Sequence, residues 1–185
     1  MKMKLAAALS GAALVMALAG CGDNSNSKLN AWAKTVCDQA STQVKKINDA
    51  NTAITKVDSA GKPADVKNAD SAAFQQISDA YKSLAGIVSK AGDPPVKNGT
   101  KLKTQAVNDL NQLSTSYSNL KKQVDGLNTA DQAKFADGLK AVSDSLGKVS
   151  KTGGQALDSL RQGDVGAAMA KQPGCRSASA SPSAS

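Results

Sequence analysis

Sulfur is the most reactive chemistry that this sequence offers. The chain has three cysteines, Cys21, Cys37 and Cys175, and it contains no histidine and no glutamate. Without histidine, neither a Ser-His-Asp nor a Cys-His arrangement for nucleophilic catalysis can form. A zinc site would lack imidazole and have too few cysteines, and no glycine-rich phosphate loop is present. We therefore expect a protein that is not an enzyme and that uses no metal and no cofactor.

Three short motifs nevertheless match those of penicillin-binding enzymes. They are Ser-x-x-Lys at 145–148, Lys-Thr-Gly at 151–153 and a Tyr-Ser-Asn at 117–119. In those enzymes Ser-x-x-Lys comes first and Lys-Thr-Gly lies far downstream on a strand. Here the order is wrong and two motifs nearly touch, so we interpret the match as coincidence. Aspartates such as Asp131, Asp137 and Asp144 could act as acids and bases, but a solvated helix face also explains them.

Residues 1–21 have the three parts of a secretory signal. Lys2 and Lys4 form a positive start, and residues 5–18 form an uncharged, mostly apolar run. That run is shorter than the about 20 apolar residues that a membrane span needs. The sequence Leu18-Ala19-Gly20-Cys21 follows directly and resembles the lipobox of bacterial lipoproteins.

The lipobox resemblance implies that the Cys21 thiol receives a diacylglyceryl group through a thioether. It also implies that a peptidase cuts between Gly20 and Cys21, so that residues 1–20 are the signal peptide. The alternative is ordinary signal cleavage, since residues 17–19 (Ala-Leu-Ala) also satisfy the small-x-small rule. That cut would leave Cys21 as a free thiol.

Lipid on Cys21 predicts a location and a disulfide. Two or three acyl chains would hold the protein on the extracytoplasmic face of the cell membrane. Residues 21–27 would be the lipidated cysteine and a polar spacer, which reaches roughly 20 Å when extended. Cys37 and Cys175 would remain as a pair in an oxidising compartment, and we predict that they form a disulfide. A redox pair is the disfavoured alternative, because the two are not in a Cys-x-x-Cys motif.

The charge of the chain has two interpretations. Loss of Lys2 and Lys4 with the leader, which contains no acidic residue, lowers the formal net charge from +8 to +6. Basic residues near anionic lipid or wall polymer contribute about 1 kcal/mol each. The scattered lysines instead favour a solvated helical surface. Nucleic acid is not an expected partner, because an exported protein would not meet it and only Arg161 and Arg176 are arginines.

Apolar residues recur at helical steps in four stretches of the chain. The first runs from Leu29 to Ala60 with Ser27 as its N-cap, and the second from about Asp70 to Ala91. The third, from Ala106 to Leu127, alternates strictly by four and three, which predicts near-antiparallel bundle packing.

The fourth stretch begins at Thr129-Ala130-Asp131-Gln132, which fits a capping box with Thr129 as N-cap. Gly153-Gly154 is expected to break or kink it, and a shorter helix follows. We therefore predict an all-α, up-down bundle of four main helices with a short C-terminal fifth helix, closed by one disulfide, over residues 28–176. The Ser/Ala/Pro tail at 177–185 is expected to be disordered.

In such a bundle the first and last helices lie side by side, so that Cys37 and Cys175 can meet. Trp32 lies on the apolar stripe and is expected to anchor the core near Cys37. The lipobox, Trp32-x-x-x-x-Cys37, a Pro-Pro after the second helix and the terminal Gln-Pro-Gly-Cys together resemble small secreted lipoproteins of actinobacteria. That resemblance implies a location and a helical fold, and little about activity.

Two functions remain open from the sequence. The first is a membrane-anchored binding or scaffolding module that uses a helical face or groove to contact a partner, such as another envelope protein. The second is a structural envelope protein that associates electrostatically with anionic wall polymer or lipid headgroups. High ionic strength should abolish the second kind of contact and spare the first.

Overall fold

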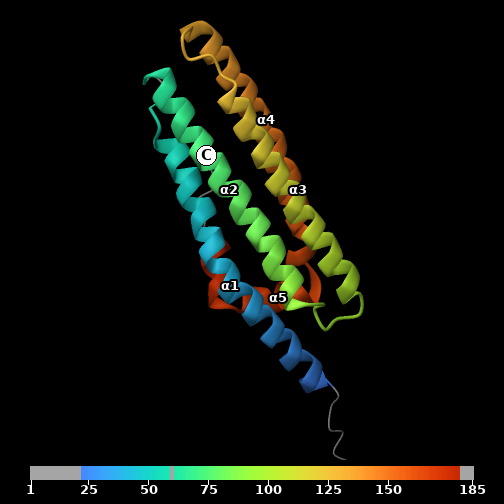
Figure 1. The fold of residues 1–185 in the computed structure, drawn as a ribbon. Helices are drawn as coiled ribbons and strands as arrows, with labels where there is room; N and C mark the ends of the chain where they lie inside the picture. The colour runs from blue at the N-terminus through green and yellow to red at the C-terminus, as the bar shows by residue number, and fades with distance from the viewer. Residues whose placement is uncertain (1–21, 59–60, 180–185) are drawn as a thin grey trace, which may run out of the picture.

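The computed structural model describes residues 22–58 and 61–179, and this part of the chain is all-α (Figure 1). Four long helices make up most of it: α1 (Gly22–Lys56), α2 (Pro63–Ala91), α3 (Gly99–Asp125) and α4 (Gln132–Arg161). Two short helices follow, α5 (Gly163–Ala170) and α6 (Pro173–Ser179). The predicted bundle of four main helices is confirmed, with one short helix more than expected. Gly20 and Cys21 lie outside the described residues.

The third apolar stretch of the sequence, residues 106–127, predicted the packing of its helix most accurately. All of its seam positions within α3 are buried: Ala106, Leu110, Leu113, Tyr117, Leu120 and Val124. The helix itself begins earlier, at Gly99, and α2 likewise begins at Pro63 instead of near Asp70. Proline at the first helical position explains the α2 start, because its missing N–H would be unpaired there in any case.

The N-cap of α4 is Asp131, and the prediction of Thr129 was wrong. The backbone N–H of Lys134 donates to Asp131 Oδ1 at 3.1 Å, and α4 starts at Gln132. A carboxylate at this position satisfies one of the unpaired amides of the first turn and also interacts favourably with the helix dipole. The capping side chain is therefore two residues later than the sequence pattern indicated.

Both ends of the described chain are more helical than predicted. Since α1 begins at Gly22, Ser27 is inside the helix and is not its N-cap. Residues 22–27 are helical, and at 1.5 Å per residue they extend about 9 Å instead of roughly 20 Å. At the other end α6 reaches Ser179, so residues 177–179 are helical and not a disordered tail. Residues 180–185 lie outside the described part.

The sequence predicted a break or a kink at Gly153-Gly154, and the break does not occur. The helix continues to Arg161, and Gly153 is buried against α3. A Cβ at this position would lie 2.7 Å from Leu113 Cδ2. The absence of a side chain therefore serves close helix packing. The chain turns instead at Gly163, whose φ of 63° is in the left-handed region that favours glycine.

Two groups of buried side chains form the core. The distal core joins residues of α1 to α4 and contains Ala50, Ala73, Phe74, Ile77, Tyr117, Leu120, Val124 and Val142. The proximal core, nearer the N-terminus of α1, contains Leu29, Trp32, Ala33, Val36, Ala85, Val88, Ala106, Leu110, Leu160, Val165 and Ala168. Tyr81 packs against both groups. The proximal core is built almost entirely from small and aliphatic side chains.

The two outer long helices are joined at one end by α5 and α6. Helices adjacent in sequence pack closely on one another from α1 to α4, whereas direct backbone packing between α1 and α4 is slight within the described residues. Instead α5 packs on both of them, and α6 packs on α1 (Figure 1). The sequence analysis attributed the meeting of Cys37 and Cys175 to first and last helices that lie side by side. That explanation was incomplete, because α5 and α6 carry the chain back to α1 after α4 ends.

Candidate ligand cavity at the disulfide-closed end

The disulfide joins α6 to α1. The Cα atoms of Cys37 and Cys175 are 5.1 Å apart, and the residues are separated by 138 positions. The predicted pairing is confirmed. Gly174 allows the approach, because a Cβ there would lie 2.5 Å from the Cys37 carbonyl oxygen. Closing a loop of this length stabilises the fold by up to about 5 kcal/mol in the chain-entropy model.

Trp32 fixes α1 to the loop that follows α2. Its indole Nε1 donates to the Gly92 carbonyl oxygen at 3.0 Å, and the side chain is only 8% exposed. The prediction that Trp32 anchors the core near Cys37 is confirmed. Gly92 ends α2 with a φ of 76°, which favours glycine at that turn.

An apolar cavity of about 270 Å³ lies between α1, α2 and the C-terminal helices. The long helices contribute aliphatic walls, with Val36, Ala40 and Val44 from α1, and Leu84, Ile87 and Val88 from α2. The short helix α5 forms the cover on one side, through Gly166, Met169 and Ala170. An apolar cavity of 150 Å³ in another protein is enough to bind benzene. This cavity is therefore large enough for part of an apolar ligand, although it is smaller than most drug-sized pockets.

Arg161 is the one charged residue among the described residues that line the cavity. It is the last residue of α4 and is solvent-exposed. No ion pair to Arg161 occurs within the described part of the chain. Burial raises the pKa of Tyr81, and the nearby positive charge of Arg161 acts in the opposite direction. The guanidinium is thus close enough to Tyr81 of α2 to influence the pKa of that tyrosine.

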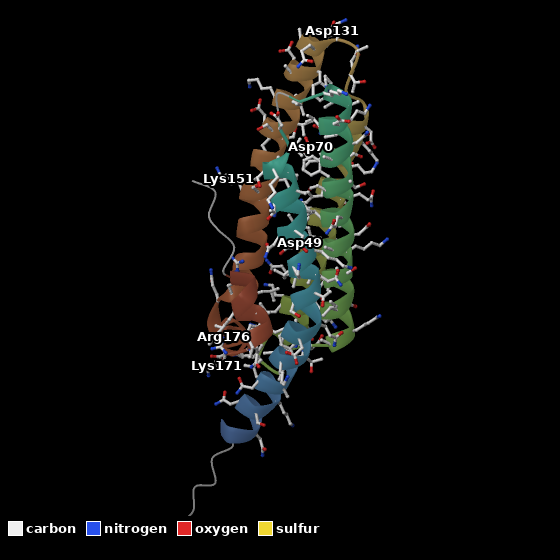
Figure 2. The ribbon with its side chains drawn as sticks, turned by 90° about the vertical axis from the view of Figure 1, so that its left-hand side faces the viewer. Asp49, Asp70, Asp131, Lys151, Lys171 and Arg176 are labelled. Atoms are coloured by element: carbon white, nitrogen blue, oxygen red, sulfur yellow. A yellow bond between two sulfur atoms is a disulfide. The ribbon has the colours of Figure 1, made fainter. Side chains whose placement is uncertain are left out.

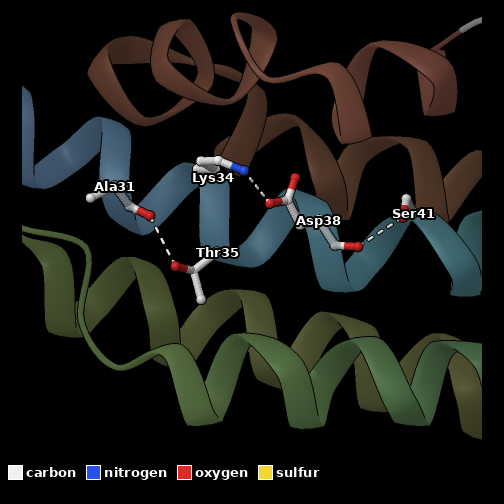
Figure 3. A network of polar contacts seen from close by, with 5 residues as sticks. All are labelled: Ala31, Lys34, Thr35, Asp38 and Ser41. Atoms are coloured by element: carbon white, nitrogen blue, oxygen red, sulfur yellow. Dashed lines mark hydrogen bonds and ion pairs between the residues drawn. The ribbon is translucent and has the colours of Figure 1, made fainter.

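The polar groups of α1 beside the disulfide satisfy one another. Figure 3 shows that Lys34 pairs with Asp38, while the Thr35 hydroxyl donates to the Ala31 carbonyl oxygen and the Ser41 hydroxyl to that of Asp38. All of these groups are on the solvent side of the helix. The apolar character of the α1 wall is therefore not interrupted by these side chains.

Ion pairs between lysine and aspartate one helical turn apart recur over the surface. They join Lys34 to Asp38, Lys45 to Asp49, Lys121 to Asp125 and Lys140 to Asp144. Exposed pairs of this kind contribute only about 0.3–0.5 kcal/mol each. They support the interpretation of the lysines as a solvated helical surface.

The residues that resembled enzyme motifs lie on two helices. Ser145, Lys148 and Lys151 follow one another along α4, and the Thr152 hydroxyl donates to the Lys148 carbonyl oxygen. Tyr117 is in the distal core, stacked on Tyr81 with ring centroids 5.6 Å apart, and burial raises its pKa to about 12. Within the described residues, no group of three or more side chains is arranged to hold a metal ion.

Comparison with protein-family models, curated proteins and solved structures finds no match to this chain. Within the described part of the chain, no helix has the length and apolar character needed to cross a bilayer. The geometry of the cavity is therefore the main basis for an argument about function. The sequence indicated a helical face or groove in general terms, but it did not single out Ala40, Met169 or Arg161. The one feature of the sequence that pointed to the cavity is that Arg161 directly follows Leu160, the last apolar residue of the expected helix.

Proposed function

We propose that this protein is a lipid-anchored, extracytoplasmic binding module without enzymatic activity, and that its ligand site is the apolar cavity between α1 and α5. The cavity is the observation that carries the binding role. The lipobox at residues 18–21 supports the anchor and the location.

The composition of the cavity wall supports a binding role. Side chains that line an unfilled apolar space lack packing partners on one side, which costs the folded state stability. The small side chain of Ala40 leaves space here. A ligand that occupies it would restore those contacts and would stabilise the folded state by mass action.

The binding role can be tested with a neutral, apolar fluorophore such as N-phenyl-1-naphthylamine. The protein would be the oxidised mature chain from residue 21 carrying Cys21→Ser, which removes the lipid attachment site. We expect saturable fluorescence enhancement with one site per chain that persists at high salt. Binding only to flexible or unfolded material would not saturate in this way.

A matched pair of variants places the site. Ala40→Phe puts a ring into the cavity and should abolish binding while the helical circular dichroism is retained. Ala53→Phe adds the same ring on an exposed position of α1 and should leave binding intact. If Ala40→Phe folds and binds normally, the cavity is not the site. If the protein shows only charge-dependent adhesion to wall polymer, the alternative of a structural envelope protein replaces this proposal.

The anchor is tested by the intact mass of protein extracted from membranes. We expect a chain that begins at Cys21 and is heavier than the bare polypeptide by a diacylglyceryl group or more. Cys21→Ala should prevent that increase and release the protein from the membrane fraction. A mature chain without added mass would contradict the lipid anchor.

A further inference from the structure

We infer that the ligand is a single-chain amphiphile with a carboxylate head, such as a fatty acid, whose tail enters the cavity and whose head pairs with Arg161. This inference rests on the proposed binding function and assigns it a chemical class.

The aliphatic walls of the cavity favour an alkyl tail on the ligand. Val44, Leu84 and Ile87 present aliphatic carbon from two neighbouring helices, and Met169 closes the opposite side. Methionine adapts its shape to an irregular apolar partner, which suits a flexible chain. A volume of about 270 Å³ has room for part of one alkyl chain and is smaller than most drug-sized pockets.

The positive charge of Arg161 favours a carboxylate head on the ligand. Arg161 lines the cavity and makes no ion pair among the described residues. Its planar, forked donors match the two oxygens of a carboxylate. A charge-assisted bond of this kind is stronger than one between neutral groups. A ligand with an apolar body and one terminal anion would therefore complement both parts of the site.

Two further basic residues lie at the same end of the bundle. Lys171 and Arg176 lie at the end of the bundle formed by α5 and α6 (Figure 2). Neither of them makes an ion pair among the described residues. Asp164, in the first turn of α5, is acidic and close to Arg161 in sequence, but it makes no ion pair with Arg161 in the described residues. Cations at this end would attract an anionic amphiphile to the cavity.

The inference is tested by displacement of the neutral fluorophore with three ligands of equal chain length. One is the fatty acid, one its neutral methyl ester, and one the corresponding alkyltrimethylammonium. We expect the acid to bind about tenfold more tightly than the ester, as one charge-assisted hydrogen bond provides. The ammonium compound should bind more weakly than the ester.

Substitution of the two arginines separates the head from the tail. Arg161→Gln should reduce binding of the acid to the level of the ester and leave the ester and the fluorophore unchanged. Arg161→Lys should restore part of the preference. Arg176→Gln removes the same charge from α6, outside the cavity lining, and should retain most of the preference.

The outcomes distinguish failure of the two proposals. If the fluorophore and all three ligands fail to bind, the binding function itself is wrong. If the ester binds as tightly as the acid, or Arg161→Gln keeps the preference, the cavity binds apolar ligands but the carboxylate assignment is wrong. An ammonium compound that binds best would also overturn the assignment.

Discussion

The distal and proximal cores of this bundle achieve their stability by different means. The distal core is filled by aromatic and large aliphatic side chains, and Phe74, Ile77 and Leu120 are at most 2% exposed. Tyr117 makes ring contacts with both Phe74 and Tyr81. The proximal core has Trp32 as its only aromatic member, and it borders a cavity of about 270 Å³. A disulfide and a short covering helix hold that end together.

This difference indicates how a chain with few aromatic residues can form both a stable fold and an apolar cavity. Dense packing at the distal end supplies stability without a cross-link. At the proximal end the covalent bond reduces the entropy of the unfolded chain, so that packing there can remain incomplete. The following variants test this division, in order of decreasing expected effect.

Phe74→Ala should cause the largest loss of stability, about 3–5 kcal/mol, because it leaves a cavity in the dense distal core. Leu160→Ala in the proximal core should cost less, since that site already borders open space and is 8% exposed. Urea denaturation followed by circular dichroism measures both. Equal losses in the two variants would contradict the proposed difference in packing.

Removal of the disulfide by Cys37→Ser with Cys175→Ser should cost about 2–4 kcal/mol. The loss should appear mainly at the proximal end. Hydrogen exchange would show reduced protection in α5 and around Trp32, while the distal segments of α2 and α3 stay protected. Uniform loss of protection along the bundle would show that the two ends do not differ in this way.

Gly174→Ala should destabilise by about 1–3 kcal/mol, because the added methyl meets the α1 backbone at Cys37. Gly147→Ala on α4 is the matched control, since no atom lies within 4 Å of the added methyl there. That change should stabilise the helix by about 0.5–1 kcal/mol. Thermal unfolding of both variants gives the comparison, and a stabilised Gly174→Ala would contradict the close approach of α6.

Asp70→Asn should have the smallest effect and should depend on pH. Asp70 of α2 is 9% exposed, and burial raises its pKa above the usual value. The folded protein therefore favours the protonated carboxyl, and stability falls as pH rises through the folded-state pKa. Asn lacks this penalty, so the variant should be more stable than the wild type at neutral pH. The difference should shrink in acid, and an Asn variant that is less stable at neutral pH would contradict this.

The sequence predicted the long helices and the disulfide because both rest on patterns that survive tertiary context. The a/d seam from Ala106 to Val124 is buried throughout, and Cys37 and Cys175 pair as expected. The prediction failed where the local conformational preference of a residue and its role in packing point to different structures. Gly153 is a helix breaker by propensity, but packing against Leu113 overrides that preference.

The cavity could not be predicted from the sequence. Ala40 and Val44 have the same periodicity as residues in a filled core, and the pattern does not record what lies opposite them. The position of α5 depends on the turn at Gly163 and on the disulfide, both of which act over long sequence distances. Arg161 lines the cavity because the chain reverses after it and places α5 next to the end of α4.

The most direct test of the cavity as a ligand site uses its methionine. Met1, Met3 and Met16 lie within residues 1–20, the proposed signal peptide, so Met169 is the only methionine of the sequence after residue 20, and it lines the cavity. A mature chain labelled with ¹³C at the methionine methyl group should give one resonance. We predict that this resonance shifts on addition of a fatty acid and stops changing at one ligand per chain, and that Ala40→Phe prevents the shift. Binding that leaves the Met169 resonance unmoved would contradict the account.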